Sequence, residues 1–175
     1  MGGITFFITK TRLKLLILPI IIVGFFLKNP LAKPDLLVEE QGKLFAVRDT
    51  NGRLLVSSKA KARFVREIWQ NMEGAELLPL KDNMMSDCRL NYCNYMDKVL
   101  IIKENNFNLN QCTNHVLVIN LSEDAFICQN VKQYVNLTSL KRRGNLSIWI
   151  EKDKMKIVGT KDFIDDRPWN NINEK

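Results

Sequence analysis

The chain has 175 residues, of which 46% are hydrophobic. This length suits one domain with a hydrophobic core, and the composition excludes an intrinsically disordered chain. The net charge is +7, but five of the 26 basic residues lie in the first 33 residues, which hold no acidic residue. The remaining 21 face 19 acidic residues, so the total charge is weak evidence for nucleic-acid binding.

An uncharged apolar run covers residues 15–27, preceded by Lys10, Arg12 and Lys14 and closed by Lys28. Extended back to residue 11, with Arg12 and Lys14 reaching the headgroups, the run attains the minimal length of a membrane-spanning helix. We expect an uncleaved anchor. A cleaved signal peptide is the alternative, although no small-x-small cleavage site follows the run.

The anchor sets the expected organisation of the chain. Basic residues before a membrane helix stay in the cytoplasm, so everything after the helix is exported. The sequence therefore predicts an anchor in residues 1–33, with its helix at about 11–28, and an extracytoplasmic domain in residues 34–175. The expected location is a bacterial inner membrane, crossed once, with the domain in the periplasm.

Short strands follow two prolines, Pro30 and Pro34, which favour a stiff connector. Apolar runs at 36–38, 43–48 and 53–57 indicate strands. The last two are separated by a turn that ends in Asn51-Gly52, a pair that supplies the positive φ angles of a tight hairpin.

A helix is predicted next, capped by Ser57 or Ser58 and ended by Gly74. Its apolar residues fall at helical spacing on one face, and we interpret that face as core packing. They are Phe64, Val65, Ile68, Trp69 and Met72. The cations lie elsewhere on the helix, on a solvated face or on one that contacts phosphate.

The second half is less regular. Residues 75–86 are expected to form a loop, residues 99–103 and 115–121 are expected strands, and residues 145–152 and 155–158 a terminal hairpin. The strand at 115–121 is apolar enough to be central in a sheet. The predicted class is α/β, strand-rich, with a mixed sheet and few helices.

Four cysteines, an even set, lie in the expected exported part: Cys88, Cys93, Cys112 and Cys128. Four cysteines allow three disulfide connectivities, and outside the cytoplasm two bridges are the natural outcome. In the cytoplasm, four buried thiols would be expected instead. The four residues between Cys88 and Cys93 suit a bridge across a turn better than a zinc knuckle.

The sequence holds no motif for catalysis. His115 is the only histidine, and no nucleophile motif, phosphate-binding loop or zinc-binding His pair accompanies it. We therefore expect no catalytic residue, no metal, no cofactor and no small-molecule substrate.

Several segments together resemble the C-terminal region of ComEC-type DNA-uptake channel proteins. The segments are PDLLV at 34–38, LFAVR at 44–48, NGRL at 51–54, Ser57-Ser58, ARFV at 62–65, Trp69, Cys88, Cys93 and Arg167-Pro168-Trp169. The resemblance implies a metallo-β-lactamase-like domain outside the membrane. It also implies the disulfide pairs Cys88 with Cys93 and Cys112 with Cys128.

Active members of that family are proposed to degrade one DNA strand with two metal ions held by several histidines and aspartates. A single histidine cannot supply that site, so the resemblance implies a degenerate branch. The channel helices of the family are also missing, which leaves a detached tail that could join a separately encoded channel portion.

The sequence thus predicts a non-catalytic, membrane-anchored accessory or vestigial domain related to DNA uptake. Its expected partners are the inner membrane, a separate channel portion and, weakly, DNA. The candidate DNA contacts are basic: Lys59, Lys61, Arg63, Arg66, Lys141, Arg142 and Arg143. The alternatives are an envelope interaction protein unrelated to DNA and a metal-dependent hydrolase or nuclease.

Overall fold

The computed structural model describes residues 32–80, 86–104, 107, 112, 115–124, 128, 131–151 and 154–163. The chain divides into two units, Met1–Lys33 and Pro34–Lys175. The expected anchor helix lies outside the described residues, as does Arg167-Pro168-Trp169. Among the described residues, neither helix has the length and apolar character that a membrane crossing requires.

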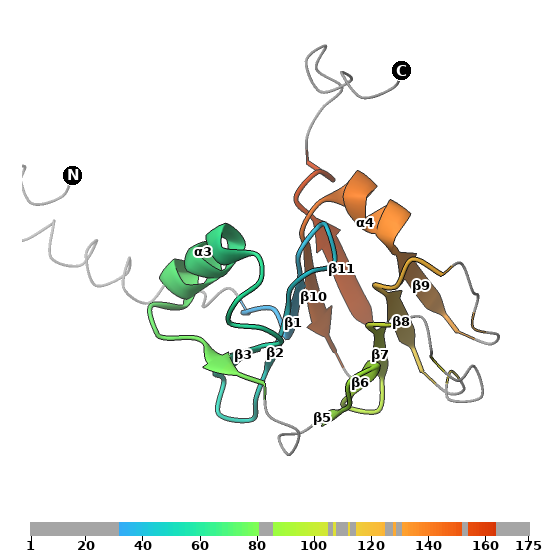
Figure 1. Ribbon diagram of the computed structural model, residues 1–175, viewed down its shortest axis with the longest axis horizontal. Helices are drawn as coiled ribbons and strands as arrows, with labels where there is room; N and C mark the ends of the chain where they lie inside the picture. Colours follow the sequence, from blue (N-terminus) through green and yellow to red (C-terminus); the bar gives the residue numbers. More distant parts are fainter. Residues whose placement is uncertain are drawn as a thin grey trace, which may run out of the picture. The chain divides into compact units, whose positions relative to one another are not determined.

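Six strands form the first sheet of the second unit, in the order β11-β10-β1-β2-β3-β4 (Figure 1). Their bounds are β1 Leu36–Val38, β2 Phe45–Arg48, β3 Leu54–Val56, β4 Leu78–Pro79, β10 Leu146–Ile150 and β11 Met155–Gly159. Neighbouring strands are antiparallel except β3 and β4, which are parallel.

Five strands form the second sheet, in the order β5-β6-β7-β8-β9. Their bounds are β5 Ser86–Cys88, β6 Tyr92–Tyr95, β7 Val99–Ile102, β8 Leu117–Asn120 and β9 Gln133–Asn136. The first three strands run antiparallel, and β7, β8 and β9 run parallel. The two described helices are α3, Arg63–Glu73, and α4, Leu137–Arg143.

The two sheets pack face to face around one apolar core. In β1, Leu36 and Val38 enter this shared core, together with residues of β7 and β8, whereas Leu37 points to the opposite face. That opposite face is covered by α3 through the buried Trp69 (Figure 1). This alternation is the period-two pattern of strands buried on both sides. The strand-rich α/β prediction is confirmed, with two mixed sheets rather than one.

The hairpin of β2 and β3 is confirmed, but only one of its turn residues has a positive φ. Gly52 has φ 75°, whereas Asn51 is not among the positive-φ residues of the described chain. The Asp49 carboxylate instead accepts hydrogen bonds from the amides of Asn51 and Arg53, at 2.9 and 2.8 Å. An aspartate that caps its own turn in this way replaces the second positive φ angle.

The predicted start of α3 was wrong, and its predicted end was right. The residue that precedes the helix is Ala62, and no side chain caps it. Ser58 instead accepts hydrogen bonds from the amides of Ala60 and Lys61, in the turn before the helix. Gly74 ends the helix in the left-handed conformation, with its amide bonded to the Gln70 carbonyl.

The apolar face of α3 was wrongly interpreted as core. Only Trp69 is buried and Val65 partly so, whereas the side chains of Phe64, Ile68 and Met72 are 75%, 41% and 68% exposed. The cause is geometric, because a lone helix on a sheet contacts it along one narrow line. The apolar stripe is wider than that line and extends into solvent.

The remaining strand predictions were right in part. Strands β7 and β8 and the hairpin of β10 and β11 are confirmed, and β8 lies between two neighbours. The expected loop at 75–86 contains β4 and the start of β5. Strands β6 and β9 and helix α4 were not predicted, because they are short and mix polar with apolar residues.

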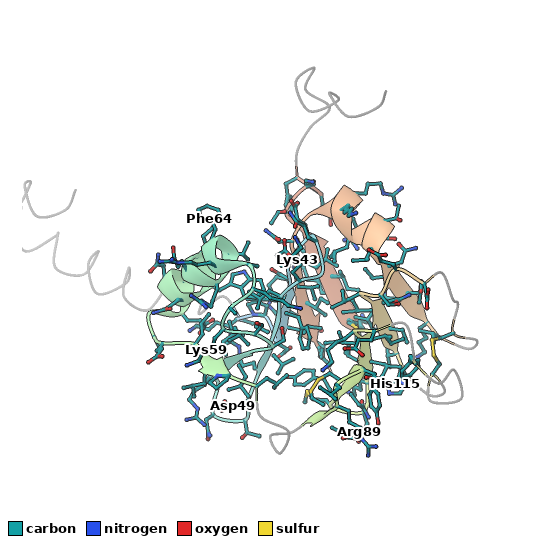
Figure 2. All side chains as sticks on the ribbon, in the orientation of Figure 1. Lys43, Asp49, Lys59, Phe64, Arg89 and His115 are labelled. Atoms are coloured by element: carbon teal, nitrogen blue, oxygen red, sulfur yellow. A yellow bond between two sulfur atoms is a disulfide. The ribbon has the colours of Figure 1, made fainter. Side chains whose placement is uncertain are left out.

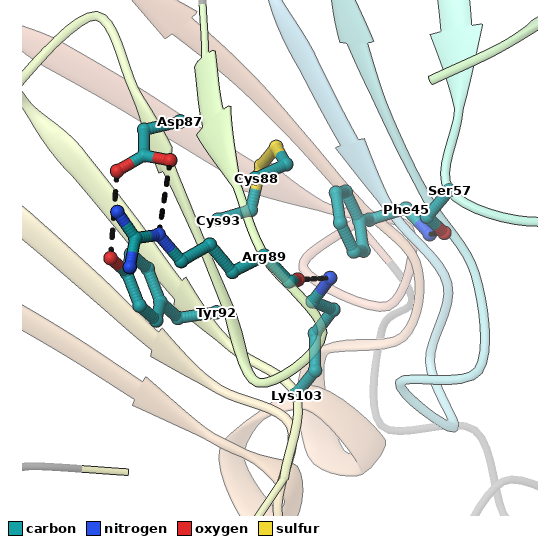
Figure 3. The surroundings of a disulfide bond; sticks show 8 residues. All are labelled: Phe45, Ser57, Asp87, Cys88, Arg89, Tyr92, Cys93 and Lys103. Carbon is teal, nitrogen blue, oxygen red and sulfur yellow. Dashed lines mark hydrogen bonds and ion pairs between the residues drawn. A yellow bond between two sulfur atoms is a disulfide. The ribbon is translucent and has the colours of Figure 1, made fainter. Parts of the chain in front are cut away.

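Two disulfides join Cys88 to Cys93 and Cys112 to Cys128, as the resemblance implied. The first links the neighbouring strands β5 and β6 (Figure 3). The second lies on the outer face of the second sheet, among Leu100, Ile102 and Val118. Both bridges therefore strengthen the second sheet.

A buried arginine connects several parts of the domain. Arg48 is 8% exposed, and its guanidinium donates to the carbonyls of Pro34 and Gly52 and to the Glu73 carboxylate, at 2.9, 2.7 and 2.7 Å. The Arg48 carbonyl accepts a 2.7 Å hydrogen bond from Tyr95 of the second sheet. Burial, the largest effect, raises the pKa of that tyrosine to about 12.

Replacing Arg48 with methionine should lower the free energy of unfolding by about 3 kcal/mol, because it removes a buried charge pair with Glu73 and the hydrogen bonds to the carbonyls of Pro34 and Gly52. Urea unfolding of the full chain in mild detergent measures the change. The control is Arg63→Met, which removes an exposed pair with Glu67 and should cost no more than about 0.5 kcal/mol. Equal losses in the two variants would contradict the assignment.

The two disulfides should differ in their contribution to stability. They close sequence separations of 5 and 16 residues. Loop-closure entropy predicts losses of about 2 kcal/mol for Cys88→Ala/Cys93→Ala and about 3 kcal/mol for Cys112→Ala/Cys128→Ala. Comparing the urea midpoints of the two double variants checks the order, and a larger loss from the shorter loop would refute it.

Candidate nucleic-acid interface

The basic residues near α3 differ in how they are paired. Lys59 lies 3.6 Å from Glu76, and Arg63 lies 2.9 Å from Glu67. Lys61 is exposed, and neither Lys61 nor Arg66 has an ion-pair partner among the described residues. Lys61 is therefore the predicted DNA contact here that is both exposed and without a competing carboxylate.

The cluster at the end of α4 is divided as well. Arg143 donates to Asp162 at 2.5 Å and to the Ile157 carbonyl at 3.1 Å. The Arg143 hydrogen bond and the Gly159 amide lower the pKa of Asp162 to about 2. Arg143 therefore holds the end of α4 against β11, whereas Lys141 and Arg142 are exposed to solvent.

A small basic pocket lies at one end of the two sheets. It collects residues from the β1–β2 loop, the segment after β3 and the ends of β7 and β8. Its described lining is Gly42, Lys43, Phe45, Ser57, Ser58, Lys61, Lys103 and Leu121. Lys43, labelled in Figure 2, is exposed and forms no ion pair with a described residue. We call this cavity the lysine pocket.

The polar groups of the lysine pocket are held by the backbone. Ser57 Oγ accepts a 3.1 Å hydrogen bond from the Phe45 amide, and Ser58 Oγ accepts from the Lys61 amide at 3.3 Å. Each hydroxyl therefore keeps its proton for another acceptor. Lys103 Nζ donates to the Arg89 carbonyl, beside the Cys88–Cys93 bridge (Figure 3).

This arrangement suits a small anion. Lysine ammonium groups and hydroxyl protons are donors, and phosphate oxygens are strong acceptors. The volume of the lysine pocket is about 120 Å³, and a second cavity at the opposite end of the sheets measures about 160 Å³. Both are well below the ~300 Å³ of pockets that enclose whole small ligands. The lysine pocket can therefore accept a phosphate group but not enclose a nucleotide.

The cavity at the other end of the sheets is less suited to an anion. It lies before β7, β8 and β9 and includes Lys98, Lys132 and Lys154, but Glu151 also lines it. A carboxylate in the wall opposes a bound phosphate. This second cavity supplies matched lysines for a control.

No group of three or more His, Cys, Asp or Glu residues that could hold a metal ion occurs in the described part of the chain. His115 lies just before β8, and its buried Nδ1 has no hydrogen-bond partner among described residues. The lysine pocket lies beyond the other end of β8, so the histidine and the pocket are far apart along the strand (Figure 2).

A comparison with known proteins found no matching family model, and no curated protein or solved structure similar to the chain.

Sequence reasoning missed Lys43 and Lys103. They lie 60 positions apart, next to strands of different sheets, and only the packing of the sheets brings them to one cavity. A local signal existed for each, because Lys103 directly follows the fully buried β7 and Lys43 lies two residues before the fully buried β2. Such a lysine indicates where a strand ends, but it does not show which strand ends lie next to one another in the folded domain.

The Arg143–Asp162 contact should make stability depend on pH in the acid range. The pKa of Asp162 falls from 3.8 to about 2 on folding, so the contact stabilises the fold above pH ~4 and is lost as the pH falls towards ~2. Asp162→Asn should therefore unfold at lower urea than wild type at neutral pH, and the difference should vanish near pH 2. Asp124→Asn, at an exposed carboxylate, should show no such gap.

Proposed function

We propose that residues 34–175 form a degenerate metallo-β-lactamase-like domain that binds the DNA backbone without cleaving it. An N-terminal anchor holds the domain on the periplasmic face of a bacterial inner membrane, as part of DNA-uptake machinery. The ComEC-like segments and the two stacked mixed sheets support the fold. Two disulfides support an oxidising compartment.

The lysine pocket carries the proposal. Lys43, Lys61 and Lys103 bring three positive charges to one cavity with two hydroxyl donors, and no described lining residue is acidic. Phosphate contacts of this kind position a nucleic acid without reading its sequence. The expected binding is therefore weak, sensitive to salt and independent of base sequence.

The same cavity supports binding over catalysis. Hydrolysis of a phosphodiester needs a group that activates water, such as a metal centre, carboxylate or imidazole. The described lining offers none of these, and His115 lies before β8, away from the pocket. An accessory role beside a separately encoded channel portion fits a domain that holds DNA and releases it intact.

Fluorescence anisotropy of a labelled DNA duplex, titrated with the full chain in detergent at several salt concentrations, tests the proposal. Each phosphate contact contributes about 0.9 to the slope of log affinity against log salt. Lys43→Gln/Lys61→Gln should weaken binding several-fold at low salt and reduce that slope by up to about 2. The predicted contacts Lys141 and Arg142 can be tested in the same way.

The matched control is Lys132→Gln/Lys154→Gln at the opposite cavity, which removes the same charge and should keep the wild-type slope. Equal losses in both double variants would mean general electrostatics without a site. Absence of DNA binding at low salt would favour the alternative, an envelope interaction protein unrelated to DNA.

A further inference from the structure

Helix α3 presents an apolar stripe that no described part of the chain covers. The stripe consists of Phe64, Ile68 and Met72, which lie one helical turn apart, and their side chains are 75%, 41% and 68% exposed. The buried Trp69 fixes the helix on the sheet. The three exposed side chains lie in one row, unlike the single apolar residues that are scattered over most protein surfaces. They form one continuous contact surface.

The chain leaves the domain beside this helix. Arg48 binds the Pro34 carbonyl with its Nε and the Glu73 carboxylate with its Nη2, at 2.9 and 2.7 Å. Glu73 is the last residue of α3 and follows Met72 of the stripe. One guanidinium therefore holds the first residue of the domain next to the end of the apolar stripe.

The length of the connecting segment limits how far this point can be from a membrane. The apolar run ends at Leu27, and residues 28–33 span at most about 20 Å when fully extended. With the run in a bilayer, as proposed above, a connector of this length would tie Pro34 to within about 20 Å of the membrane. The helix itself is about 16 Å long, so the proposed anchor would leave its whole stripe able to reach the membrane surface.

The charges around the stripe favour phospholipid headgroups. All three carboxylates near the helix are paired, Glu73 with Arg48, Glu67 with Arg63 and Glu76 with Lys59. Lys61 and Arg66 have no ion-pair partner among the described residues. The helix and the turn before it therefore carry an unbalanced positive charge, as do helices that lie in the membrane interface.

We infer that α3 docks on the surface of the phospholipid bilayer, with Phe64, Ile68 and Met72 inserted at the level of the headgroups. The inference rests on the proposed membrane anchor. Docking gives the domain a defined orientation on the membrane, since an anchor joined through a connector alone leaves the domain free to rotate.

Photo-crosslinking in vesicles of phosphatidylethanolamine and phosphatidylglycerol tests the docking. The full chain carries the photoreactive residue benzoylphenylalanine at Phe64, or at Phe163 as a matched control, because the two phenylalanines are 75% and 78% exposed. Mass spectrometry measures the lipid adduct at each position. The adduct should be several-fold more abundant at position 64, and Ile68→Ser/Met72→Ser should reduce it to the control level.

Equal adducts at both positions, or none at position 64, would overturn the docking. A covalent dimer from position 64 would also overturn it and assign the stripe to a second copy of the chain. An alkaline carbonate wash distinguishes failure of the proposed membrane anchor from failure of the docking of α3. A chain that is washed off disproves the anchor and the docking together, whereas a retained chain without the adduct disproves the docking alone.

Discussion

The buried guanidinium of Arg48 is the contact on which most of the domain depends. Its three side-chain partners belong to the start of the domain, the turn of the β2–β3 hairpin and the end of α3, and its own carbonyl binds Tyr95 of the second sheet. A buried arginine is stable only when its donors are satisfied, so these four parts must arrive together. The same residue also determines where the connector to the N-terminal segment leaves the fold.

Burial of the strands on both sides explains the position of the chemistry. The side chains of β1, β2 and β3 alternate between the shared core and the face under α3, so neither face of these strands is free to bind a ligand. Polar groups that could bind a ligand are therefore confined to the ends of strands and to loops. Lys43, Ser57 and Lys103 all lie in such positions, and their chemistry depends on which strand ends the packing brings together.

Local patterns predicted the elements whose structure is decided locally. The β2–β3 hairpin follows from two apolar runs and one glycine turn. Strand β8 follows from a run of three apolar residues that ends in Asn120, all of them buried in the sheet. The exposed stripe of α3 was not predictable, because the sequence shows that a face is apolar but not how much sheet area is available to cover it. The lysine pocket was not predictable either, since its members meet only through long-range packing of two sheets.

The two proposed surfaces meet at one helix, with the lysine pocket at its start and the apolar stripe along its length. Lys61 lines the lysine pocket just before α3 begins, and the connector leaves the domain beside Glu73, where α3 ends. If α3 docks flat on the bilayer as proposed, the lysine pocket, at the start of a helix about 16 Å long, also lies close to the membrane surface. DNA held in that pocket would run close to the membrane, where a channel would receive it. The two proposals therefore agree with each other: docking through α3 would keep the lysine pocket near the membrane, and DNA bound in the pocket would run along that surface.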